Sequence, residues 1–455
     1  MKVELIFPAF EIYFTHEAPI GLAYLKAVCR EAGHEVEVFD NNVMNLPMEE
    51  ALEKIRGADV AAMSMTTPTF RTVKKMCEAI RKKVGIPVIL GGPHPTINPG
   101  QCLDFCDFVV MGEGEETFVE LLDAIARGKK LQDLKKIKGL GFRWGKRKIV
   151  NGPRPLNQEL DKLPFPDWTG FPIEKYGSAI RTSGRSLPIV TSRGCPFNCC
   201  YCFKGLFGRA FRPRSPKSVV DELLYLKKNF QIKEFQVADD AFAADRKRAI
   251  GICKEMVKRK VNLPWSLPNG IRAGSLDEEV VKWMKKAGLK YTGLGIESGS
   301  QKILDGIGKQ QNLDEVRTAV KLLKKYKITT VGFFMFGLPG DTVETMEETT
   351  RFAKSLDLDY CSISMTTPYP GTRLYEEVES KGGRFLVKNE EELFSLGSKC
   401  KFAMPGMASP EEIEKTYRKA RVQLLLQPKT ILRALKSLKK LWAGAKVAYK
   451  WILKT

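Results

Sequence analysis

Short apolar runs and amphipathic stretches alternate through two parts of this chain, and this alternation restricts its fold more than any other feature. The apolar runs of residues 1–125 read KVELIFPA, EVEVFD, DVAAMSMTT, PVILGG and DFVVMG. Helix-like stretches such as GLAYLKAVCREAG and TVKKMCEAIRKKV separate them. Near-continuous apolar strands between helices indicate a parallel sheet covered on both faces, with ligands at the carboxyl ends of its strands. We therefore predict a doubly wound, Rossmann-like α/β domain over residues 1–140.

A second alternating series covers residues 186–385, with apolar runs PIVTSRG, EFQVADD, LPWSLPNG, YTGLGIES, TTVGFFMFG and CSISMTTPYPG. Six strand–helix units predict a partial (β/α)6 barrel, whose chemistry is expected at the carboxyl ends of the strands. Residues 141–185 are rich in Lys, Gly and Pro and predict a linker, although GLGFRWGKRKIV at its start could form a small hairpin. Residues 386–455 are predicted to form a helical carboxyl-terminal region.

The bulk properties favour a multidomain protein of the cytoplasm. A chain of 455 residues usually folds as two or three packed units. No apolar run approaches the roughly 20 residues that cross a bilayer. The start, MKVELIFPAFEIYF, lacks the basic and apolar segments of a signal peptide and is expected to begin with a strand.

The eleven cysteines do not suggest a disulfide framework, because their number is odd and most stand alone in apolar stretches. Four fall in the loop TSRGCPFNCCYCF, where Cys195, Cys199 and Cys202 have C-x3-C-x2-C spacing. Iron–sulfur clusters normally take four protein ligands, so three thiolates leave one iron open for a cofactor or substrate. Cys200 is either a fourth ligand or a bystander, and we favour the bystander because adjacent side chains in an extended loop point apart. The alternative, a zinc site, usually needs a second pair of ligands, and none is visible.

This loop, followed by strand ends in the matching order, resembles the radical S-adenosylmethionine (SAM) superfamily. The resemblance implies an enzyme whose [4Fe-4S] cluster is bound by Cys195, Cys199 and Cys202. SAM would chelate the open iron, and one electron from an external donor such as a flavodoxin or ferredoxin would cleave it. The products would be methionine and a 5'-deoxyadenosyl radical that abstracts hydrogen from carbon.

The resemblance also implies SAM contacts at the strand ends. Tyr201 would lie beside the adenine, or else belong to the core. VADDAF brings Asp239 or Asp240 to the methionine amino group, although the usual glycine pair is absent there. Arg272 would hold the carboxylate, or form a surface ion pair. The remaining implied contacts are Asn269, Glu297 at the ribose, and Gly337, Pro339 and Gly340 at the adenine.

The first domain carries APIGLAYLKAV, MTTPTF, GGPHPT and MGEGEETF. Through these segments it resembles the cobalamin-binding modules at the amino terminus of one class of radical SAM enzymes. The implied corrin contacts are Thr66, Thr67, Thr69, Gly91, Gly92, His94, Gly112, Glu113, Gly114 and Glu115. The D-x-H-x-x-G motif that supplies a cobalt-binding histidine is missing, so His94 is expected to be a loop contact. We expect cobalamin without a histidine ligand, its lower face covered from the 66–70 loop. The alternative is a vestigial domain that binds no corrin.

The net charge of +21, from 74 basic and 53 acidic residues, comes largely from the carboxyl terminus. From Lys415 onward there are twelve basic residues and no acidic one. A helical apolar stripe in residues 429–455, opposite lysines, predicts binding to an anionic membrane surface. A docked helix or a coiled coil is the alternative. The stripe consists of Ile431, Leu435, Leu438, Trp442, Ala445, Tyr449 and Ile452.

Three functions remain open at this point. The first is methylation of an unactivated carbon of a small molecule, or of a lipid or isoprenoid if the tail binds the inner face of the membrane. The second is radical carbon–carbon bond formation, such as ring formation or contraction, without methyl transfer. The third, an iron–sulfur protein that binds nucleic acid, is disfavoured because no base-stacking aromatic residues line the basic face.

Overall fold

The computed structural model describes residues 1–9, 17–128, 130–177, 184–388, 392–393 and 398–427. The chain forms two compact units. The first unit consists of residues 1–176 and 203–214, and the second of residues 177–202 and 215 onward. The predicted tail helix within residues 429–455 lies outside the described residues.

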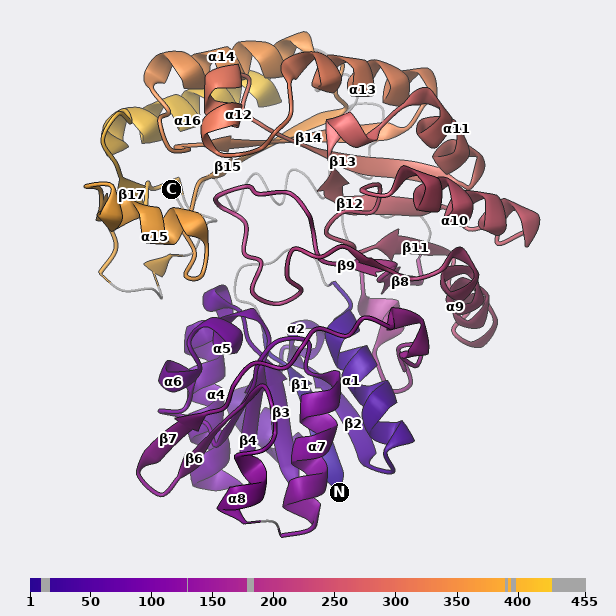
Figure 1. The fold of residues 1–455 in the computed structure, drawn as a ribbon, viewed down its shortest axis with the longest axis vertical. Helices are drawn as coiled ribbons and strands as arrows, with labels where there is room; N and C mark the ends of the chain where they lie inside the picture. The colour runs from indigo at the N-terminus through magenta and orange to yellow at the C-terminus, as the bar shows by residue number, and fades with distance from the viewer. Residues whose placement is uncertain (10–16, 129, 178–183, 389–391, 394–397, 428–455) are drawn as a thin grey trace. The chain divides into compact units, whose positions relative to one another are not determined.

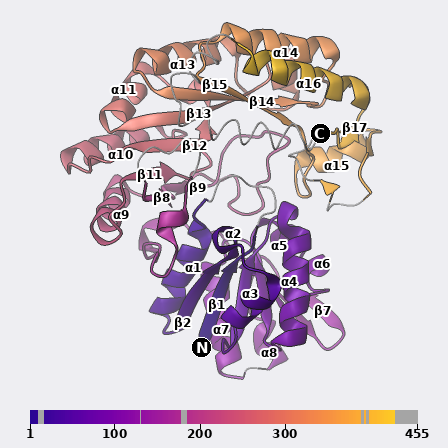
Figure 2. The same ribbon diagram turned by 180° about the vertical axis from the view of Figure 1, so that it is seen from behind.

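The first unit has the predicted doubly wound architecture, with helices on both faces of a sheet of seven strands (Figures 1 and 2). Helices α1 and α7 lie over one face, and α3 and α4 over the other. Its strands are β1 (Lys2–Phe7), β2 (Glu35–Asp40), β3 (Val60–Ser64), β4 (Val88–Gly91), β5 (Phe108–Val110), β6 (Leu140–Trp144) and β7 (Arg147–Val150), with the short β10 (Arg212–Pro213) apart from the sheet. Its helices are α1 (Ile20–Glu31), α2 (Asn41–Met44), α3 (Met48–Lys54), α4 (Phe70–Lys83), α5 (Pro93–Ile97), α6 (Pro99–Cys102), α7 (Glu115–Ala126) and α8 (Leu131–Leu134), with 3₁₀ turns η1 (Thr67–Thr69), η2 (Leu160–Lys162) and η3 (Ile173–Lys175).

The strand order β2-β1-β3-β4-β5-β6-β7 places a topological switch point between β1 and β3. Strands β1 to β5 are parallel. In such sheets ligands bind at the carboxyl ends of the strands beside the switch point. The loops after β3, β4 and β5 therefore hold the positions at which a ligand is expected.

The structure differs from the predicted linker at 141–185. Strand β6 pairs antiparallel with β5, and β7 pairs with β6, so this hairpin extends the first sheet. The side chains of Leu140 and Phe142 are fully buried, which explains why the hairpin stays with the sheet. Residues up to 176 belong to the first unit, and so does the later segment 203–214. Local composition did not reveal either attachment.

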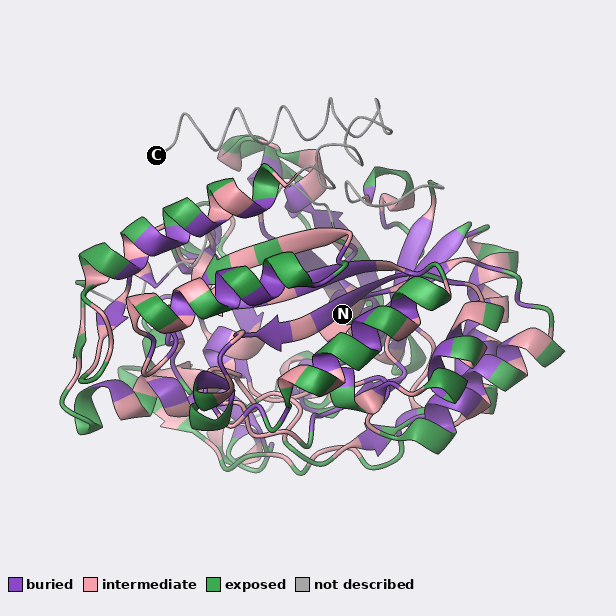
Figure 3. Cartoon of the chain, turned by 90° about the horizontal axis from the view of Figure 1, so that it is seen from above, coloured by how far each residue is buried: buried purple, intermediate pink, exposed green. Residues whose placement is uncertain are grey.

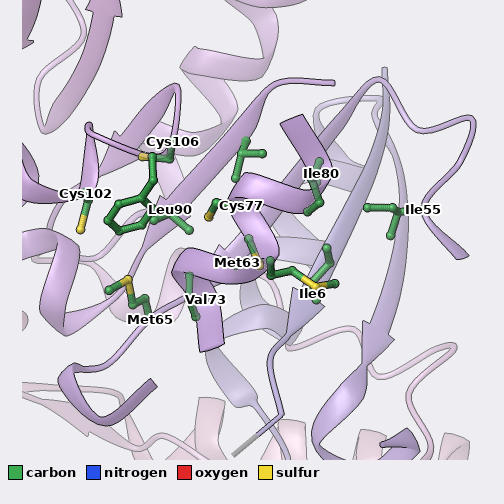
Figure 4. Close-up of a cluster of buried hydrophobic side chains, with 14 of the residues drawn as sticks. Ile6, Ile55, Met63, Met65, Val73, Cys77, Ile80, Leu90, Cys102 and Cys106 are labelled. Carbon is green, nitrogen blue, oxygen red and sulfur yellow. The ribbon is translucent and has the colours of Figure 1, made fainter. Parts of the chain in front are cut away.

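The core of the first unit contains a group of three buried thiols (Figure 4). Cys77, Cys102 and Cys106 lie among apolar side chains from the strands and from α3 and α4. Burial raises the pKa of Cys102 to about 12 and raises those of Cys77 and Cys106 further. These thiols are protonated packing groups at neutral pH.

Glu4, in the middle of β1, makes the stability of the first unit depend on pH. Burial and the nearby Glu37 raise the pKa of the Glu4 carboxyl from 4.5 to about 7. The native state therefore binds more protons than the unfolded state between these values, and stability falls as the pH rises from 4.5 to 7. We expect Glu4→Gln to remove this slope and to raise the free energy of unfolding at pH 8 by about 3 kcal/mol. Urea denaturation at pH 5 and pH 8 measures both effects, and an unchanged slope in the variant would assign the pH dependence to another group.

The second unit is built on a six-stranded parallel sheet in the order β15-β14-β13-β12-β11-β8. Successive strands are neighbours and the two edge strands do not pair, so the sheet is the predicted partial barrel. Its strands are β8 (Ser186–Ile189), β11 (Glu234–Val237), β12 (Trp265–Ile271), β13 (Leu289–Glu297), β14 (Thr329–Phe336) and β15 (Tyr360–Met365), and the short strands β9 (Ser192–Arg193), β16 (Arg384–Phe385) and β17 (Phe402–Ala403) lie outside it. Its helices are α9 (Pro216–Asn229), α10 (Arg246–Lys258), α11 (Glu278–Lys286), α12 (Gln301–Gly306), α13 (Leu313–Lys325), α14 (Val343–Ser355), α15 (Arg373–Ser380) and α16 (Pro410–Leu425), with the 3₁₀ turn η4 (Ala273–Ser275).

Helices α10, α11, α13 and α14 lie along the outer face of the curved sheet of the second unit, whereas α15 lies beside β16 (Figure 1). Buried and exposed residues alternate along these helices, as amphipathic helices resting on a sheet require (Figure 3). Helix α16 packs against α14 and β15, so the carboxyl-terminal region begins as part of the barrel wall. Among the described residues, no helix has the length and apolar character needed to span a bilayer.

Candidate active site

Cys195, Cys199 and Cys202 lie in the loop that follows β8 and β9. Cys195 is buried, whereas Cys199 and Cys202 are partly exposed. The Cys202 amide donates a hydrogen bond to the Cys199 carbonyl oxygen at 3.3 Å, which closes the loop between these two residues. In the described residues, no three His, Cys, Asp or Glu side chains converge as ligands of a single metal ion do. A four-iron cluster differs from a zinc site in this respect, because each thiolate binds a different iron.

Cys200 faces away from that loop into the core of the second unit. Its side chain is 2% exposed and packs with apolar residues of α12 and α15. Its amide donates to the Ile307 carbonyl oxygen at 3.0 Å, and its carbonyl oxygen accepts from Leu374 at 2.9 Å. Burial raises the pKa of the Cys200 thiol to about 11. These contacts make Cys200 a packing residue, which agrees with the bystander interpretation.

A backbone distortion at the end of β13 sets the direction of the Glu297 side chain. The register with β14 shifts between Gly295 and Glu297, and Glu297 has a φ of 69°, in the left-handed region. Bulges of this kind redirect a side chain, and strained residues gather at functional sites. The buried carboxylate pairs with Lys309, whose Nζ lies 2.8 Å from Glu297 Oε1. The carboxylate proposed for the ribose is therefore held by a lysine that sequence patterns did not reveal.

The Glu297–Lys309 pair interacts electrostatically with residues of the cysteine loop. Burial alone would lower the pKa of Lys309, but Glu297 and the Cys199 thiol together raise it. Burial also raises the pKa of Tyr201. The Glu297 carboxylate raises it further, and so does the Cys199 sulfur, to which the Tyr201 hydroxyl is hydrogen-bonded. Tyr201 therefore lies near both the Cys199 sulfur and the Glu297 carboxylate.

Arg272, after β12, is the second cation near the cysteines. Its guanidinium lies 4.2 Å from the centre of the Phe197 ring, within the cysteine loop. Burial lowers the pKa of Arg272, while Glu315, Cys199 and Cys195 counteract this effect. The charged groups around Arg272 are thus Glu315 and two thiols of the cysteine loop. An arginine at this position suits a carboxylate ligand.

The other predicted SAM contacts, at the ends of β11 and β12, differ in burial and in their hydrogen-bond partners. The Asp239 carboxylate is buried and accepts hydrogen bonds from the Thr191 amide at 2.6 Å and the Ser192 hydroxyl at 2.6 Å. It therefore anchors the start of the cysteine loop. Asp240 is exposed. The Asn269 amide donates to the Ala238 carbonyl oxygen at 3.0 Å and so joins β12 to β11.

The turn Gly337–Gly340 follows β14 at the same edge of the sheet. Gly337 has a φ of 74°, and a Cβ there would lie 3.2 Å from Ile413 of α16, so a side chain is excluded on both grounds. Pro339 and Gly340 remain half-buried. Asp341 accepts from the Leu338 amide at 2.9 Å and fixes the turn. Backbone without side chains is what an adenine ring needs for close approach.

In the first unit, polar side chains at the carboxyl ends of the strands are hydrogen-bonded to one another. Thr66 and Thr69 form a capping box at η1. Thr67 Oγ1 lies 3.1 Å from His94 Nδ1, and His94 Nε2 lies 2.9 Å from Gln101 Oε1. His94 is 1% exposed, with both ring nitrogens occupied by protein groups. This histidine ties the 66–70 and 92–101 segments together through its two ring nitrogens.

The glycines of this edge keep room beside the backbone. Gly91 ends β4, and Gly92 has a φ of 100° with its added Cβ 3.0 Å from the Met65 carbonyl oxygen. Gly112, with a φ of 76°, would place a Cβ in open space. Gly114 and the buried Glu115 begin α7. A cavity of about 300 Å³ within the first unit is lined by Gly112 to Glu116, by the 150–157 segment, and by Gly205 and Leu206.

Glu113 also joins distant segments of the first unit. Its carboxylate accepts a hydrogen bond from the Asn157 amide at 2.8 Å and pairs with Arg212 at 2.9 Å. It therefore fastens the 157 and 212 segments to the turn after β5.

Sequence comparisons identify both units. Residues 13–122 match the B12 binding domain family, and residues 189–353 match the radical SAM superfamily. The chain is 35% identical to an uncharacterised methyltransferase of Pyrococcus horikoshii, over 95% of this chain and 94% of that protein. The chain belongs to the cobalamin-dependent radical SAM methyltransferase family. This enzyme is also 31% identical to the anaerobic magnesium-protoporphyrin IX monomethyl ester cyclase of Rubrivivax gelatinosus, over 80% of this chain and 66% of the cyclase.

Its fold matches a solved structure of the radical SAM methyltransferase TsrM from Kitasatospora setae with cobalamin and a [4Fe-4S] cluster bound. The TM-score is 0.74 at 20% identity, covering 94% of this chain and 89% of TsrM. The cofactors of this radical SAM enzyme are therefore a [4Fe-4S] cluster, SAM and cobalamin. The residues present fit them: three thiols share one loop with cations beside them, and glycines open the strand ends of the first unit.

Because His94 is part of the core of this enzyme, we expect His94→Ala to act on stability alone. Loss of its ring and both hydrogen bonds should lower the free energy of unfolding by about 2–4 kcal/mol. The visible spectrum of bound cobalamin should not change, because both nitrogens of His94 are hydrogen-bonded to protein groups. Chemical denaturation and the spectrum measured on the same samples test this. A spectrum that shifts in the variant would restore His94 as a cobalt ligand.

Proposed function

We propose that this chain is a C-methyltransferase that modifies an unactivated carbon of a small molecule. The similarity to a methyltransferase over nearly its whole length carries this proposal. When bound, the cluster, SAM and cobalamin supply the radical and the methyl group. The chain's own part is to hold SAM, through Tyr201, Arg272, Glu297 and the Gly337–Gly340 turn, beside Cys199. Asp240 and Asn269 remain proposed contacts at the rim, and an external one-electron donor such as a flavodoxin or ferredoxin is part of the proposal.

Ring formation without methyl transfer is a second candidate, because the chain is similar to the magnesium-protoporphyrin ester cyclase. The two candidates differ in how SAM is consumed. The anaerobically reconstituted enzyme is incubated with SAM and dithionite, with and without hydroxocobalamin. Cobalamin-dependent release of S-adenosylhomocysteine supports methylation. 5'-Deoxyadenosine without S-adenosylhomocysteine, together with turnover of magnesium-protoporphyrin IX monomethyl ester, supports cyclisation and contradicts our first choice.

We further propose that the enzyme works in the cytoplasm, peripherally on the inner face of the membrane, and that its substrate is a lipid or isoprenoid. The basic, amphipathic sequence 429–455 supports this. So does the end of α16, where Val422, Leu425 and Leu426 are 55%, 60% and 63% exposed. Large apolar residues exposed together commonly mark an interaction site.

The membrane proposal predicts binding to lipid vesicles. The holoenzyme should co-sediment with phosphatidylglycerol vesicles at low salt and much less with phosphatidylcholine vesicles, because lysines near an anionic surface contribute about 1 kcal/mol each. The triple variant Lys436→Glu, Lys439→Glu, Lys440→Glu should abolish co-sedimentation. Lys302→Glu, on the exposed surface of α12, is the matched control and should bind like the wild type. Equal binding by both variants would exclude the tail as the membrane anchor.

A further inference from the structure

The chain changes units directly after the last cluster cysteine. Cys202 ends one stretch of the second unit, and Phe203 begins a segment of the first unit that continues to Arg214. We call residues 203–214 the arm. The cobalamin-binding unit is thus completed by residues joined covalently to a proposed ligand of the cluster.

The arm is fastened by a buried ion pair. The side chains of Arg212 and Glu113 are 3% and 9% exposed, and Arg212 Nη1 lies 2.9 Å from Glu113 Oε1. The guanidinium also donates to the carbonyl oxygens of Asn157, at 2.5 Å, and Phe207, at 3.0 Å. Because Glu113 also accepts from the Asn157 amide, one cluster of charge-assisted hydrogen bonds joins the turn after β5, the 150–157 segment and the arm.

Close packing supports the same attachment. Gly208 has a φ of 70°, and a Cβ there would lie 2.7 Å from Leu156 Cδ1. At the end of the arm, the Arg214 guanidinium lies 5.7 Å from the centre of the Phe165 ring. Gly205 and Leu206 line the 300 Å³ cavity together with the glycines after β5. The arm is therefore part of the wall of the region in which a corrin contact is expected.

We propose that Arg212 is a positioning residue that couples the cobalamin-binding unit to the cluster loop. A buried ion pair has one favourable arrangement, since displacing either charge leaves the other unpaired. A ligand that orders the turn after β5 thereby orders Glu113, Arg212 and the arm, and only two residues separate Cys202 from Gly205 in the cavity wall. Cobalamin binding stabilises the cluster, and by linkage the cluster strengthens cobalamin binding. This inference rests on the proposed cluster cysteines and not on methyl transfer.

The rate of iron loss measures this coupling. The anaerobically reconstituted full-length protein is mixed with excess EDTA, with and without saturating hydroxocobalamin. In the wild type we expect hydroxocobalamin to slow iron release by about fivefold or more, the usual lower range of coupling between two sites. In Arg212→Ala the ratio of the two rates should fall to about one, although the variant still binds both cofactors.

Arg209→Ala is the matched control, because Arg209 is an exposed arginine of the same arm. It should keep the wild-type ratio. If Arg212→Ala does not fold, Arg212→Lys tests the proposal instead. This variant keeps the positive charge next to Glu113 but loses the hydrogen bonds to the carbonyl oxygens of Asn157 and Phe207. Its ratio of iron-release rates should fall below that of the wild type. A wild-type ratio of one, or an undiminished ratio in the Arg212 variants, would overturn the proposal. S-adenosylhomocysteine release is not measured here, so failure of the methylation proposal gives a separate result.

Discussion

Replacing Cys199 by serine is expected to reduce the iron content of the reconstituted protein from about four atoms per chain to background and to abolish reductive cleavage of SAM. The hydroxyl has nearly the size of the thiol, but iron–sulfur clusters are held by thiolates. Cys195→Ser and Cys202→Ser should have the same result. Iron determination and detection of 5'-deoxyadenosine by chromatography check both effects.

Cys200→Ala is the control, because Cys200 belongs to the same loop but packs into the core. It should retain iron and SAM cleavage and lose about 1–2 kcal/mol of stability from the small cavity it leaves. Loss of the cluster in this variant would make Cys200 a ligand and leave no iron open for SAM.

Lys309→Met is expected to lower the free energy of unfolding of the cluster-free protein by about 3–5 kcal/mol. The substitution keeps most of the side-chain volume but leaves the Glu297 carboxylate buried without its partner, and breaking a buried pair from one side has this cost. Anaerobic urea denaturation measures the loss. Lys302→Met, on the exposed face of the preceding helix, should change stability by no more than about 0.5 kcal/mol.

The double variant Glu297→Gln, Lys309→Met distinguishes the pair from simple loss of packing. Because neither charge remains buried, it should recover much of the stability that Lys309→Met loses. If the stability loss of the double variant equals the sum of the losses of the two single variants, the two residues stabilise the fold independently. The double variant should still bind SAM poorly, since the carboxylate proposed for the ribose is gone.

Sequence patterns predicted the parts of the fold that local chemistry decides. Buried parallel strands are continuous apolar runs, so both sheets and the order of their strand ends were predicted. The cysteine spacing identified the cluster loop, and the side-chain alternation of an extended loop separated Cys200 from its neighbours. The absence of the D-x-H-x-x-G motif argues against His94 as a cobalt ligand, and only the structure reveals its two hydrogen-bond partners.

What the sequence did not predict depends on contacts between distant segments. Lys309 is separated from Glu297 by a helix and carries no motif, and its role follows from burial beside Cys199. Glu113 looked like a loop contact for a corrin, but Arg212, almost 100 residues later, occupies its carboxylate. The 141–185 segment has the composition of a linker, yet its start belongs to β6, whose buried Leu140 and Phe142 side chains join it to the first sheet.

The buried thiols of the first unit simplify the chemistry of labelling this protein. Only thiolates react with iodoacetamide, and burial keeps Cys77, Cys102 and Cys106 protonated at neutral pH. Cys29 and Cys253 are protected in the same way. In the folded apoprotein, alkylation therefore falls on the partly exposed thiols, Cys199 and Cys202 among them. A mass-spectrometric count of modified cysteines can thus report how many molecules in a preparation carry the cluster, without iron analysis or a spectrum.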